Sequence, residues 1–486
     1  MNESPELHPL HLIASPRSIA FFGASNRFTS MGTNQLHSLI SLGFKGAVYP
    51  IHPQESQVLG LKAYKEVSEL PETPDLAVMV LPTSLVLETV EACGRRGIPR
   101  AIIVSGGFKE VGAEGRDLEE QLKALASHYG IRFLGPNCLG VTNPHHKLNT
   151  TFLPYTADPG FIGFASQSGS FLTQMFDYLA ALGLGFSTAV SVGNEANIDL
   201  VDCLEYLALS PQTKVIGLYI EGLRRGRDFI ESARKIVPHK PIVAYYVGGS
   251  EAGKKAGLSH TGSLAGPERL YDGVFHQSGI IRANSMTELF DFCWVLGSCF
   301  PLRGKRLAIQ THSGGPGATA ADACGREGLD LAEFAPATLE HLAPFVPHTG
   351  SLNNPVDITF SKNPLDFFQE IPRTLLEDPK TDGLLIYLML PEQHVRRGLL
   401  QGGLPEDQLE DTLDQVIKMT AQSIMSLPKN SQKPVIGFTY RSQIDRLIQL
   451  LQKKGFPVLP SPERAARAMA ALVQYQRIRE VRGSKD

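Results

Sequence analysis

Short apolar segments of strand length recur along the chain, and amphipathic stretches separate them. The first five cover residues 18–22, 47–49, 76–81, 101–104 and 131–134. Continuous apolar runs are typical of strands buried on both faces, and helix-length spacing between them gives the βαβ rhythm of a parallel sheet. The sequence therefore predicts doubly wound α/β domains.

The rhythm restarts twice, which predicts three domains. A second series covers 161–165, 188–192, 215–220 and 242–247 and ends near 279–282, and a third covers 307–310, 384–388, 435–438 and 458–459, followed by a helix predicted over 462–477. The break at Gly135-Pro136-Asn137 and a polar linker through Lys147 mark the first boundary. A chain of 486 residues has room for about three domains. We expect domains over 1–147, 148–300 and 301–486, and similar openings favour the last two as divergent copies.

Composition argues against several classes of protein. Lys and Arg number 46 against 49 Asp and Glu, a net charge of −3, so no basic field is expected to hold a nucleic acid backbone. No stretch approaches the ~20 uninterrupted apolar residues of a membrane span, and the first 15 residues lack the features of a secretory signal. The six cysteines form no CxxC pair, which predicts a reducing, cytoplasmic location.

Ligands of doubly wound sheets bind beyond the carboxyl ends of the strands, so the loops there are the places to search. The first is Gly23-Ala24-Ser25, whose small residues let backbone N–H groups approach a phosphate. It is not a full GxGxxG, and Tyr49-Pro50-Ile51-His52-Pro53 replaces the expected acidic ribose contact. The pattern disfavours a nicotinamide cofactor and leaves open another phosphate-bearing nucleotide or a simple tight turn.

Three further strand ends of the first domain carry small or polar residues. They are Leu81-Pro82-Thr83-Ser84, Ser105-Gly106-Gly107-Phe108 and Gly135-Pro136-Asn137-Cys138. Each by itself is ordinary turn chemistry. Four such loops on one rim favour a ligand groove.

The second domain opens with a loop rich in Ser and Gly. Ser166-Gln167-Ser168-Gly169 leads into a helix predicted over 170–182, where hydroxyls and free N–H groups suit an oxyanion or a phosphoryl group. A plain N-cap by Ser168 is the alternative. Gly193-Asn194-Glu195 follows the next strand and is expected to form another wall of the same pocket.

His260 is the sharpest candidate for chemistry. It lies among small residues in Ser259-His260-Thr261-Gly262, where an imidazole can reach a ligand, although a lone histidine is more often structural. An imidazole can also carry a phosphoryl group covalently. Glu221, an acid at the end of an apolar strand, needs a partner and is suited to orient the ring.

The competing histidines are weaker candidates. His312, beside a Gly-rich turn, is the second choice for chemistry, with close backbone packing as the alternative. The adjacent His145 and His146 lack the spacing at which side chains converge on one metal ion. We therefore expect no metal site in the chain.

In this order the motifs resemble the succinyl-CoA synthetase superfamily, and more closely the alpha subunit of ADP-forming (NDP-forming) acetate–CoA ligases. The third domain agrees with the resemblance, which extends over about residues 12–477. The motifs that carry it are Gly23-Ala24-Ser25, Gly135-Pro136-Asn137-Cys138, Ser166-Gln167-Ser168-Gly169, Ser259-His260-Thr261-Gly262, Ser313-Gly314-Gly315-Pro316-Gly317 and Asn354-Pro355-Val356-Asp357.

The resemblance implies a Rossmann-like CoA-binding domain followed by two flavodoxin-like domains. It implies an acid–thiol ligase that interconverts acyl-CoA, phosphate and ADP with a small carboxylic acid such as acetate, CoA and ATP. The route runs through an acyl phosphate and a phosphohistidine, with His260 in the position of the phosphorylated residue and Glu221 in that of the acid that steadies it. The implied phosphate contacts are Ser166, Gln167, Ser168, Gly169, Gly193 and Asn194, and the implied CoA contacts are Gly23, Ala24, Ser25, Pro50, Pro82, Ser105, Gly106, Gly107, Asn137 and Cys138.

After three domains are assigned, no region remains for the ATP-grasp domain that handles the nucleotide in this family. The resemblance therefore implies a separate ATP-grasp beta subunit that binds ADP or ATP with Mg²⁺, in a hetero-oligomer such as α2β2. Two features depart from the family pattern: Tyr246-Val247-Gly248-Gly249 replaces a basic run, and Arg225 replaces an acid. A catalytically altered CoA-binding regulatory protein is thus an alternative, and a nicotinamide-dependent oxidoreductase is the least favoured hypothesis.

Overall fold

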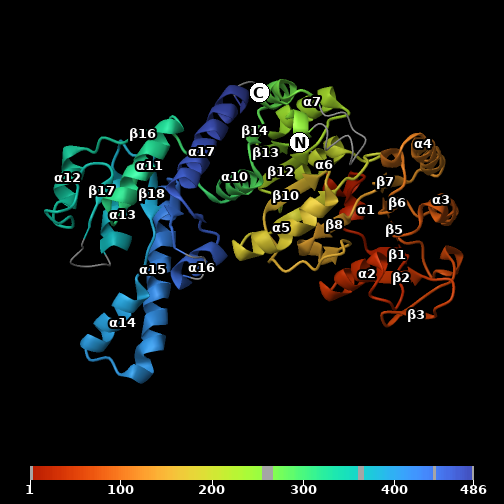
Figure 1. The fold of residues 1–486 in the computed structure, drawn as a ribbon, viewed down its shortest axis with the longest axis horizontal. Coiled ribbons are helices and arrows are strands. Elements are labelled where there is room, and N and C mark those ends of the chain that lie inside the picture. Colours follow the sequence, from red (N-terminus) through yellow and green to blue (C-terminus); the bar gives the residue numbers. More distant parts are fainter. Residues whose placement is uncertain (1–3, 254–265, 360–365, 442–444, 484–486) are drawn as a thin grey trace. The chain divides into compact units, whose positions relative to one another are not determined.

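The computed structural model describes residues 4–253, 266–359, 366–441 and 445–483 (Figure 1). The chain divides into two compact units. The first comprises Met1–Ala181 with Gly185–Leu289, and the second comprises Leu182–Leu184 with Phe290–Asp486. His260 lies outside the described residues.

The first unit opens with a five-stranded parallel sheet in the order β2-β1-β5-β6-β7. Its core strands are buried on both faces, as their continuous apolar runs predict. The order reverses between β1 and β5, and such a switch point is where doubly wound sheets bind ligands. The strands are β1 (Ser18–Phe22), β2 (Ala47–Ile51), β5 (Leu76–Met79), β6 (Arg100–Ile103) and β7 (Arg132–Leu134), with a separate hairpin of β3 (Gln57–Val58) and β4 (Leu61–Lys62).

Helices connect these strands and supply the second half of the hydrophobic core. α3 and α4 pack against each other beside the sheet (Figure 1), and they cover Ala77, Ile103 and Phe133 in one buried cluster. The helices are α1 (His11–Ala14), α2 (Met31–Ser41), α3 (Val86–Arg96) and α4 (Ala113–His128).

The second sheet has seven strands in the order β14-β13-β12-β10-β11-β8-β9. β10 to β14 pair in parallel, whereas β8 is antiparallel to both β11 and β9. The strands are β8 (Gly140–Asn143), β9 (Leu148–Asn149), β10 (Ile162–Ser166), β11 (Phe186–Ser191), β12 (Val215–Ile220), β13 (Ile242–Tyr246) and β14 (Ile281–Ala283); the helices are α5 (Gly169–Ala181), α6 (Leu200–Leu209), α7 (Gly226–Ile236), α9 (Glu268–Ser278) and α10 (Met286–Ser298).

The expected polar linker through Lys147 is wrong. A 3-10 helix, η5 (Pro144–His146), joins β8 to β9, and both strands belong to the second sheet, with Thr142 opposite Asn149. β8 and the edge strand β9 are only four and two residues long. Segments this short are too brief to show a periodic pattern of apolar residues, so the sequence does not distinguish these strands from a polar linker.

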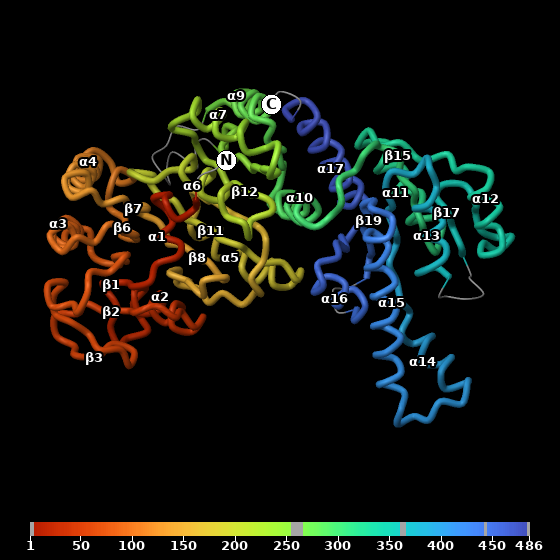
Figure 2. Tube along the Cα trace, turned by 180° about the vertical axis from the view of Figure 1, so that it is seen from behind, coloured from red at the N-terminus to blue at the C-terminus, as the bar shows by residue number. Residues whose placement is uncertain are grey.

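The second unit contains a parallel sheet in the order β16-β15-β18-β19-β20, with β17 paired to β15. α11 packs against α17, although almost the whole unit separates them in sequence (Figure 2). The strands are β15 (Arg306–Thr311), β16 (Asp330–Leu331), β17 (Val356–Asp357), β18 (Gly383–Tyr387), β19 (Val435–Phe438) and β20 (Val458–Leu459); the helices are α11 (Gly314–Arg326), α12 (Pro336–Leu342), α13 (Glu370–Glu377), α14 (Glu392–Gln401), α15 (Leu409–Ser431), α16 (Arg446–Lys453) and α17 (Pro462–Gly483).

The loops that open the second and third domains share one hydrogen-bond pattern. After β10, Ser166 Oγ donates to Ser168 O at 2.7 Å and accepts from Ser168 N at 3.1 Å. After β15, Thr311 Oγ1 donates to Ser313 O at 2.9 Å and accepts from Ser313 N at 3.1 Å. The match supports the expectation that the two domains are divergent copies.

Candidate functional site

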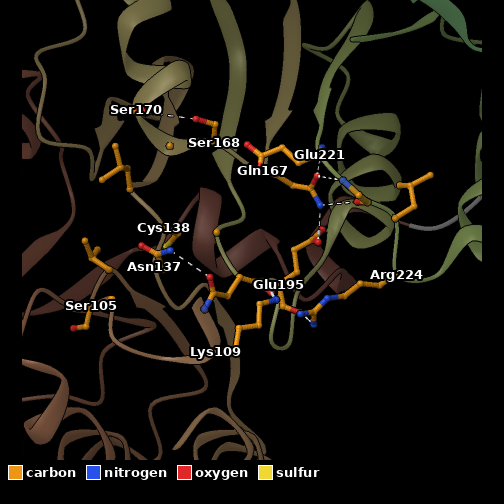
Figure 3. A pocket seen from close by; sticks show the side chains of 18 of the residues that line it. Ser105, Lys109, Asn137, Cys138, Gln167, Ser168, Ser170, Glu195, Glu221 and Arg224 are labelled. Atoms are coloured by element: carbon orange, nitrogen blue, oxygen red, sulfur yellow. Dashed lines mark hydrogen bonds between the residues drawn. The ribbon is translucent and has the colours of Figure 1, made fainter. Parts of the chain in front are cut away.

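A cavity of about 900 Å³ in the first unit is lined by loops from both of its large sheets (Figure 3). The first sheet contributes the segments after β5, β6 and β7, and the second those after β10, β11 and β12. The lining includes ten of the residues expected from the sequence: Ser105, Gly106, Asn137, Cys138, Gln167, Ser168, Gly169, Gly193, Asn194 and Glu221. Two motif groups that lie far apart in sequence therefore share one pocket.

The Ser-rich loop presents a helix start to this cavity. Ser168 Oγ accepts a hydrogen bond from Phe171 N at 3.4 Å, so the N-cap considered from the sequence is present. The Ser166 hydroxyl is also engaged within the loop. The first N–H groups of an α-helix have no partner within the helix and attract anions. α5 thus offers N–H groups and the Ser170 hydroxyl to a ligand in the cavity.

The Gln167 side chain connects three loops of the second sheet. Its Nε2 donates to Glu195 Oε2 at 2.7 Å and to Gly222 O at 2.8 Å. Its Oε1 accepts from Glu221 N at 2.5 Å and from Gly222 N at 3.0 Å. With both its donors and its acceptor engaged, the amide fixes the backbone that carries Glu221. This geometry supports a positioning role for Gln167 in addition to the phosphate contact that the resemblance implies.

Glu195, expected from the sequence to form a wall of the pocket, lines the cavity and is 8% exposed. Its Oε1 accepts from Leu200 N at 2.9 Å. Burial raises the pKa of this carboxyl to about 8. Because an isolated buried carboxylate is costly, Glu195 is mostly uncharged at pH 7.

Asn194 ties the second sheet to the loops of the first. Its Nδ2 donates to Glu110 Oε2 at 2.6 Å and to Glu119 Oε2 at 2.9 Å. Its Oδ1 accepts from Asn137 Nδ2 at 3.3 Å. The network holds the expected CoA side and the expected phosphate side of the cavity together.

The remaining residues with expected CoA contacts lie around the first sheet and do not line this cavity. Gly23 follows β1 with φ +86°, and Ser25 N donates to Thr33 Oγ1 at 3.0 Å. Pro50 is inside β2, where it pairs with Phe21. The other residues of this group are Ala24, Pro82 and Gly107.

Cys138 contributes packing rather than a nucleophile. Its side chain is 2% exposed, and Sγ donates to Ile103 O at 3.4 Å. Burial raises the pKa of the thiol to about 12. At neutral pH the sulfur is therefore protonated, and the thiol of any bound CoA is the more reactive one.

Sequence reasoning missed two cations of the cavity, Lys109 and Arg224. Lys109 lies just beyond the Ser105-Gly106-Gly107-Phe108 motif, and Arg224 three residues after Glu221. No spacing rule marks either residue. The one available signal was that each lies in a loop that follows a strand.

His312, the second choice for chemistry, is a packing residue of the second unit. Its ring stacks on Phe367 with centroids 3.6 Å apart. Burial lowers the pKa of its imidazole to about 4. The ring is therefore neutral in the folded chain over most of the pH range.

Replacement of His312 by phenylalanine should remove a pH dependence of folding. In the wild type, the neutral ring makes its full contribution to the free energy of unfolding above pH 6.5. As pH falls from 6.5 towards 4, this free energy decreases by about 1.4 kcal/mol per pH unit, because the unfolded state binds the proton more tightly. Urea unfolding followed by the fluorescence of Trp294, the single tryptophan, reports on this unit. The exposed His394→Asn variant is the control, and equal pH profiles for H312F and wild type would contradict the prediction.

Two further properties concern metals and membranes. Nowhere in the described ranges do three or more His, Cys, Asp or Glu side chains gather as a metal site. Across the same residues, every helix is too short or too polar to cross a membrane.

Three protein-family models match consecutive parts of the chain. The CoA binding domain matches residues 17–144, the succinyl-CoA ligase like flavodoxin domain matches 159–296, and the ligase-CoA domain matches 307–390. Their order is the one that the resemblance implies.

Characterised relatives match over almost the whole chain. The alpha subunit of the ADP-forming acetate–CoA ligase II of Pyrococcus furiosus is 37% identical, and the match covers 95% of this chain and 96% of the relative. The ADP-forming acetate–CoA ligase I of Archaeoglobus fulgidus is also 37% identical; the match covers 95% of this chain but 63% of that longer relative. The dinucleotide-forming acetyl-coenzyme A synthetase 1 of Ca. Korarchaeum cryptofilum, solved with phosphate and ADP, superposes with a TM-score of 0.86 at 34% identity, covering 98% of this chain and 99% of that one.

Proposed function

The chain belongs to the family of ADP-forming acetate–CoA ligases, and on this premise we propose that its cavity exchanges a thioester for an acyl phosphate. Such acid–thiol ligases interconvert acyl-CoA, phosphate and ADP with a carboxylic acid, CoA and ATP. One observation assigns the reaction to this cavity. Loops of the CoA-binding domain line one part of it, and the N-terminus of α5 in the flavodoxin-like domain lines another. A thioester and a phosphate can therefore meet in one place.

The proposed reaction has two steps at this site. A phosphate oxygen attacks the thioester carbonyl carbon, the C–S bond breaks, and CoA leaves as its thiol after taking up the proton of the phosphate. A ring nitrogen of His260 then attacks the phosphorus of the acyl phosphate, the P–O bond breaks, and the carboxylate leaves. Phosphoryl transfer needs positioning and fixed donors, which the start of α5 supplies.

The described neighbours of His260 support its place in this reaction. The chain re-enters the described structure at Gly266, which lines the cavity. His260 stands six positions before Gly266 in the sequence. Tyr246 Oη donates to Gly266 O at 2.8 Å and its ring stacks on Tyr271, which fixes this point of re-entry.

Glu221 is proposed as the carboxylate that orients the imidazole. Its side chain lines the cavity, while its backbone N–H is held by Gln167. A carboxylate at one ring nitrogen fixes the tautomer and leaves the other nitrogen as the nucleophile. Glu221 acts on the ring and makes no covalent bond.

The nucleotide half of the reaction is proposed to lie on a second chain. Relatives of this length are named as alpha subunits, and the longer Archaeoglobus relative is named as a whole ligase. We assign ADP or ATP and Mg²⁺ to an ATP-grasp beta subunit, with α2β2 as the expected assembly and acetate or another small acid as the substrate. The six free thiols accord with the cytoplasmic location expected from the sequence.

The test is reconstitution of the chain with an ATP-grasp partner. Acetyl-CoA, phosphate and ADP together should yield ATP, and omission of any one should stop it. Incubation of the chain with acetyl-CoA and radioactive phosphate should give an acid-labile, base-stable label on the protein. Tight CoA binding in calorimetry, with no turnover of any short acyl-CoA beside the partner, would instead favour the regulatory alternative.

A further inference from the structure

Two positive charges face the cavity from different sheets. Lys109 follows β6 of the first sheet, and Arg224 follows β12 of the second. They are the only Lys or Arg among the described residues that line the cavity. They are therefore the described cations available to an anionic substrate in this space.

The two cations converge on neighbouring carbonyl groups of one loop (Figure 3). Lys109 Nζ donates to Asn194 O, and Arg224 Nη1 donates to Glu195 O at 2.7 Å. An ammonium has three donors and a guanidinium five, so most of their N–H groups remain available to a ligand. The carbonyls hold both side chains in place without neutralising them.

Arg224 differs in its charge environment from the arginine beside it. Arg225 hydrogen-bonds to Asp199 and lies 3.2 Å from an oxygen of Asp202, and these contacts raise its pKa. Burial alone lowers the pKa of Arg224, and no described carboxylate offsets this effect. A guanidinium that no described carboxylate pairs is well suited to bind an anion.

We propose that Lys109 and Arg224 together bind the phosphate group in this cavity, first as inorganic phosphate and then as part of the acyl phosphate. The proposal rests on the proposed function. The start of α5 supplies neutral donors, whereas a phosphate dianion also needs compensating charge, which these two residues supply. The same chemistry would suit the phosphate groups of CoA, and the experiment separates the two sources.

The surroundings favour this role. Glu195, whose main-chain oxygen holds Arg224, is buried, and the raised pKa of its carboxyl leaves it mostly uncharged at pH 7. It therefore cancels little of the positive charge. Because the two cations come from different sheets, full phosphate affinity requires the CoA-binding loop at Lys109 to be in place.

The experiment uses the complete enzyme with its partner and the variants Lys109→Met and Arg224→Gln. We expect each to raise the KM for phosphate by about 10- to 100-fold, the usual effect of a lost charged hydrogen bond. The KM for acetyl-CoA should change by less than about twofold. Arg227→Gln is the matched control, since Arg227 is an exposed cation three residues along that does not line the cavity.

Binding to the isolated chain gives a readout that needs no turnover. Calorimetry with inorganic phosphate should show weaker binding by both variants, and calorimetry with CoA should show unchanged binding. Arg224→Lys should retain most of the phosphate affinity, and an unchanged melting temperature excludes misfolding. Loss of CoA affinity with phosphate binding intact, or no change in either, overturns the proposal; a wild-type enzyme that binds phosphate but makes no ATP defeats the proposed function instead.

Discussion

Replacement of His260 by asparagine should reduce ATP formation from acetyl-CoA, phosphate and ADP by at least about 10³-fold. Asparagine has no ring nitrogen to accept the phosphoryl group, so the path to the nucleotide ends at the acyl phosphate. The first step does not use the imidazole. Exchange of thioester for acyl phosphate should therefore continue in the variant.

Arsenate provides the measurement that separates these two steps. It replaces phosphate in the attack on the thioester, and the acyl arsenate hydrolyses in water, so CoA thiol is released continuously without any phosphohistidine. Wild type and H260N should both release thiol in arsenate. With phosphate in place of arsenate, only the wild type should form ATP in the presence of ADP and the partner, and only the wild type should take up the base-stable label. The control is His276→Asn, a change of an exposed histidine on α9.

Two results would contradict this assignment. Wild-type labelling of H260N would show that another residue carries the phosphoryl group. If H260N lost both arsenate-dependent thiol release and ATP formation while its melting temperature stayed unchanged, His260 would act in the attack on the thioester.

A Gly23→Ala substitution should unfold or severely weaken the CoA-binding sheet. Gly23 has φ +86°, and a Cβ there would lie 1.9 Å from Val80 O. That carbonyl cannot easily move, because Val80 N donates to Phe22 O at 3.1 Å. Left-handed strain and overpacking each cost about 1–3 kcal/mol, so we expect a loss of about 3–5 kcal/mol and no measurable CoA binding.

Gly60→Ala is the matched control for this prediction. Gly60 has nearly the same φ, +82°, but an added Cβ would meet nothing within 4 Å. It should therefore show only the left-handed cost of about 1–2 kcal/mol and normal CoA binding. Urea unfolding followed by circular dichroism, with CoA calorimetry, compares the two variants; equal losses would show that the close approach to Val80 is unimportant.

The strands that pattern alone located are those with long apolar runs. β12 (Val215–Ile220) and β19 (Val435–Phe438) lie where the sequence predicts them, and the resemblance to the ligase family is confirmed by relatives and a solved structure. β8, β9, β16 and β17 escaped prediction. They are two to four residues long, and their pairing depends on a neighbouring strand rather than on their own composition.

Side-chain partners were less predictable than loop positions. The loops after the strands were expected to carry the site, and many of them do line one cavity. The sequence did not indicate that the Gln167 amide would join three loops, or that the ring of His312 would stack on Phe367. Both facts depend on residues more than 25 positions away.

By itself, the sequence determined the doubly wound architecture and the ligase family, because apolar periodicity and ordered loop motifs are local properties of the chain. Only the tertiary structure decided that Lys109 and Arg224 meet on adjacent carbonyls in the cavity that the start of α5 also lines. Their charges come from different sheets, 115 positions apart in sequence. Such convergence follows from the way the two sheets pack, which no local pattern of residues encodes.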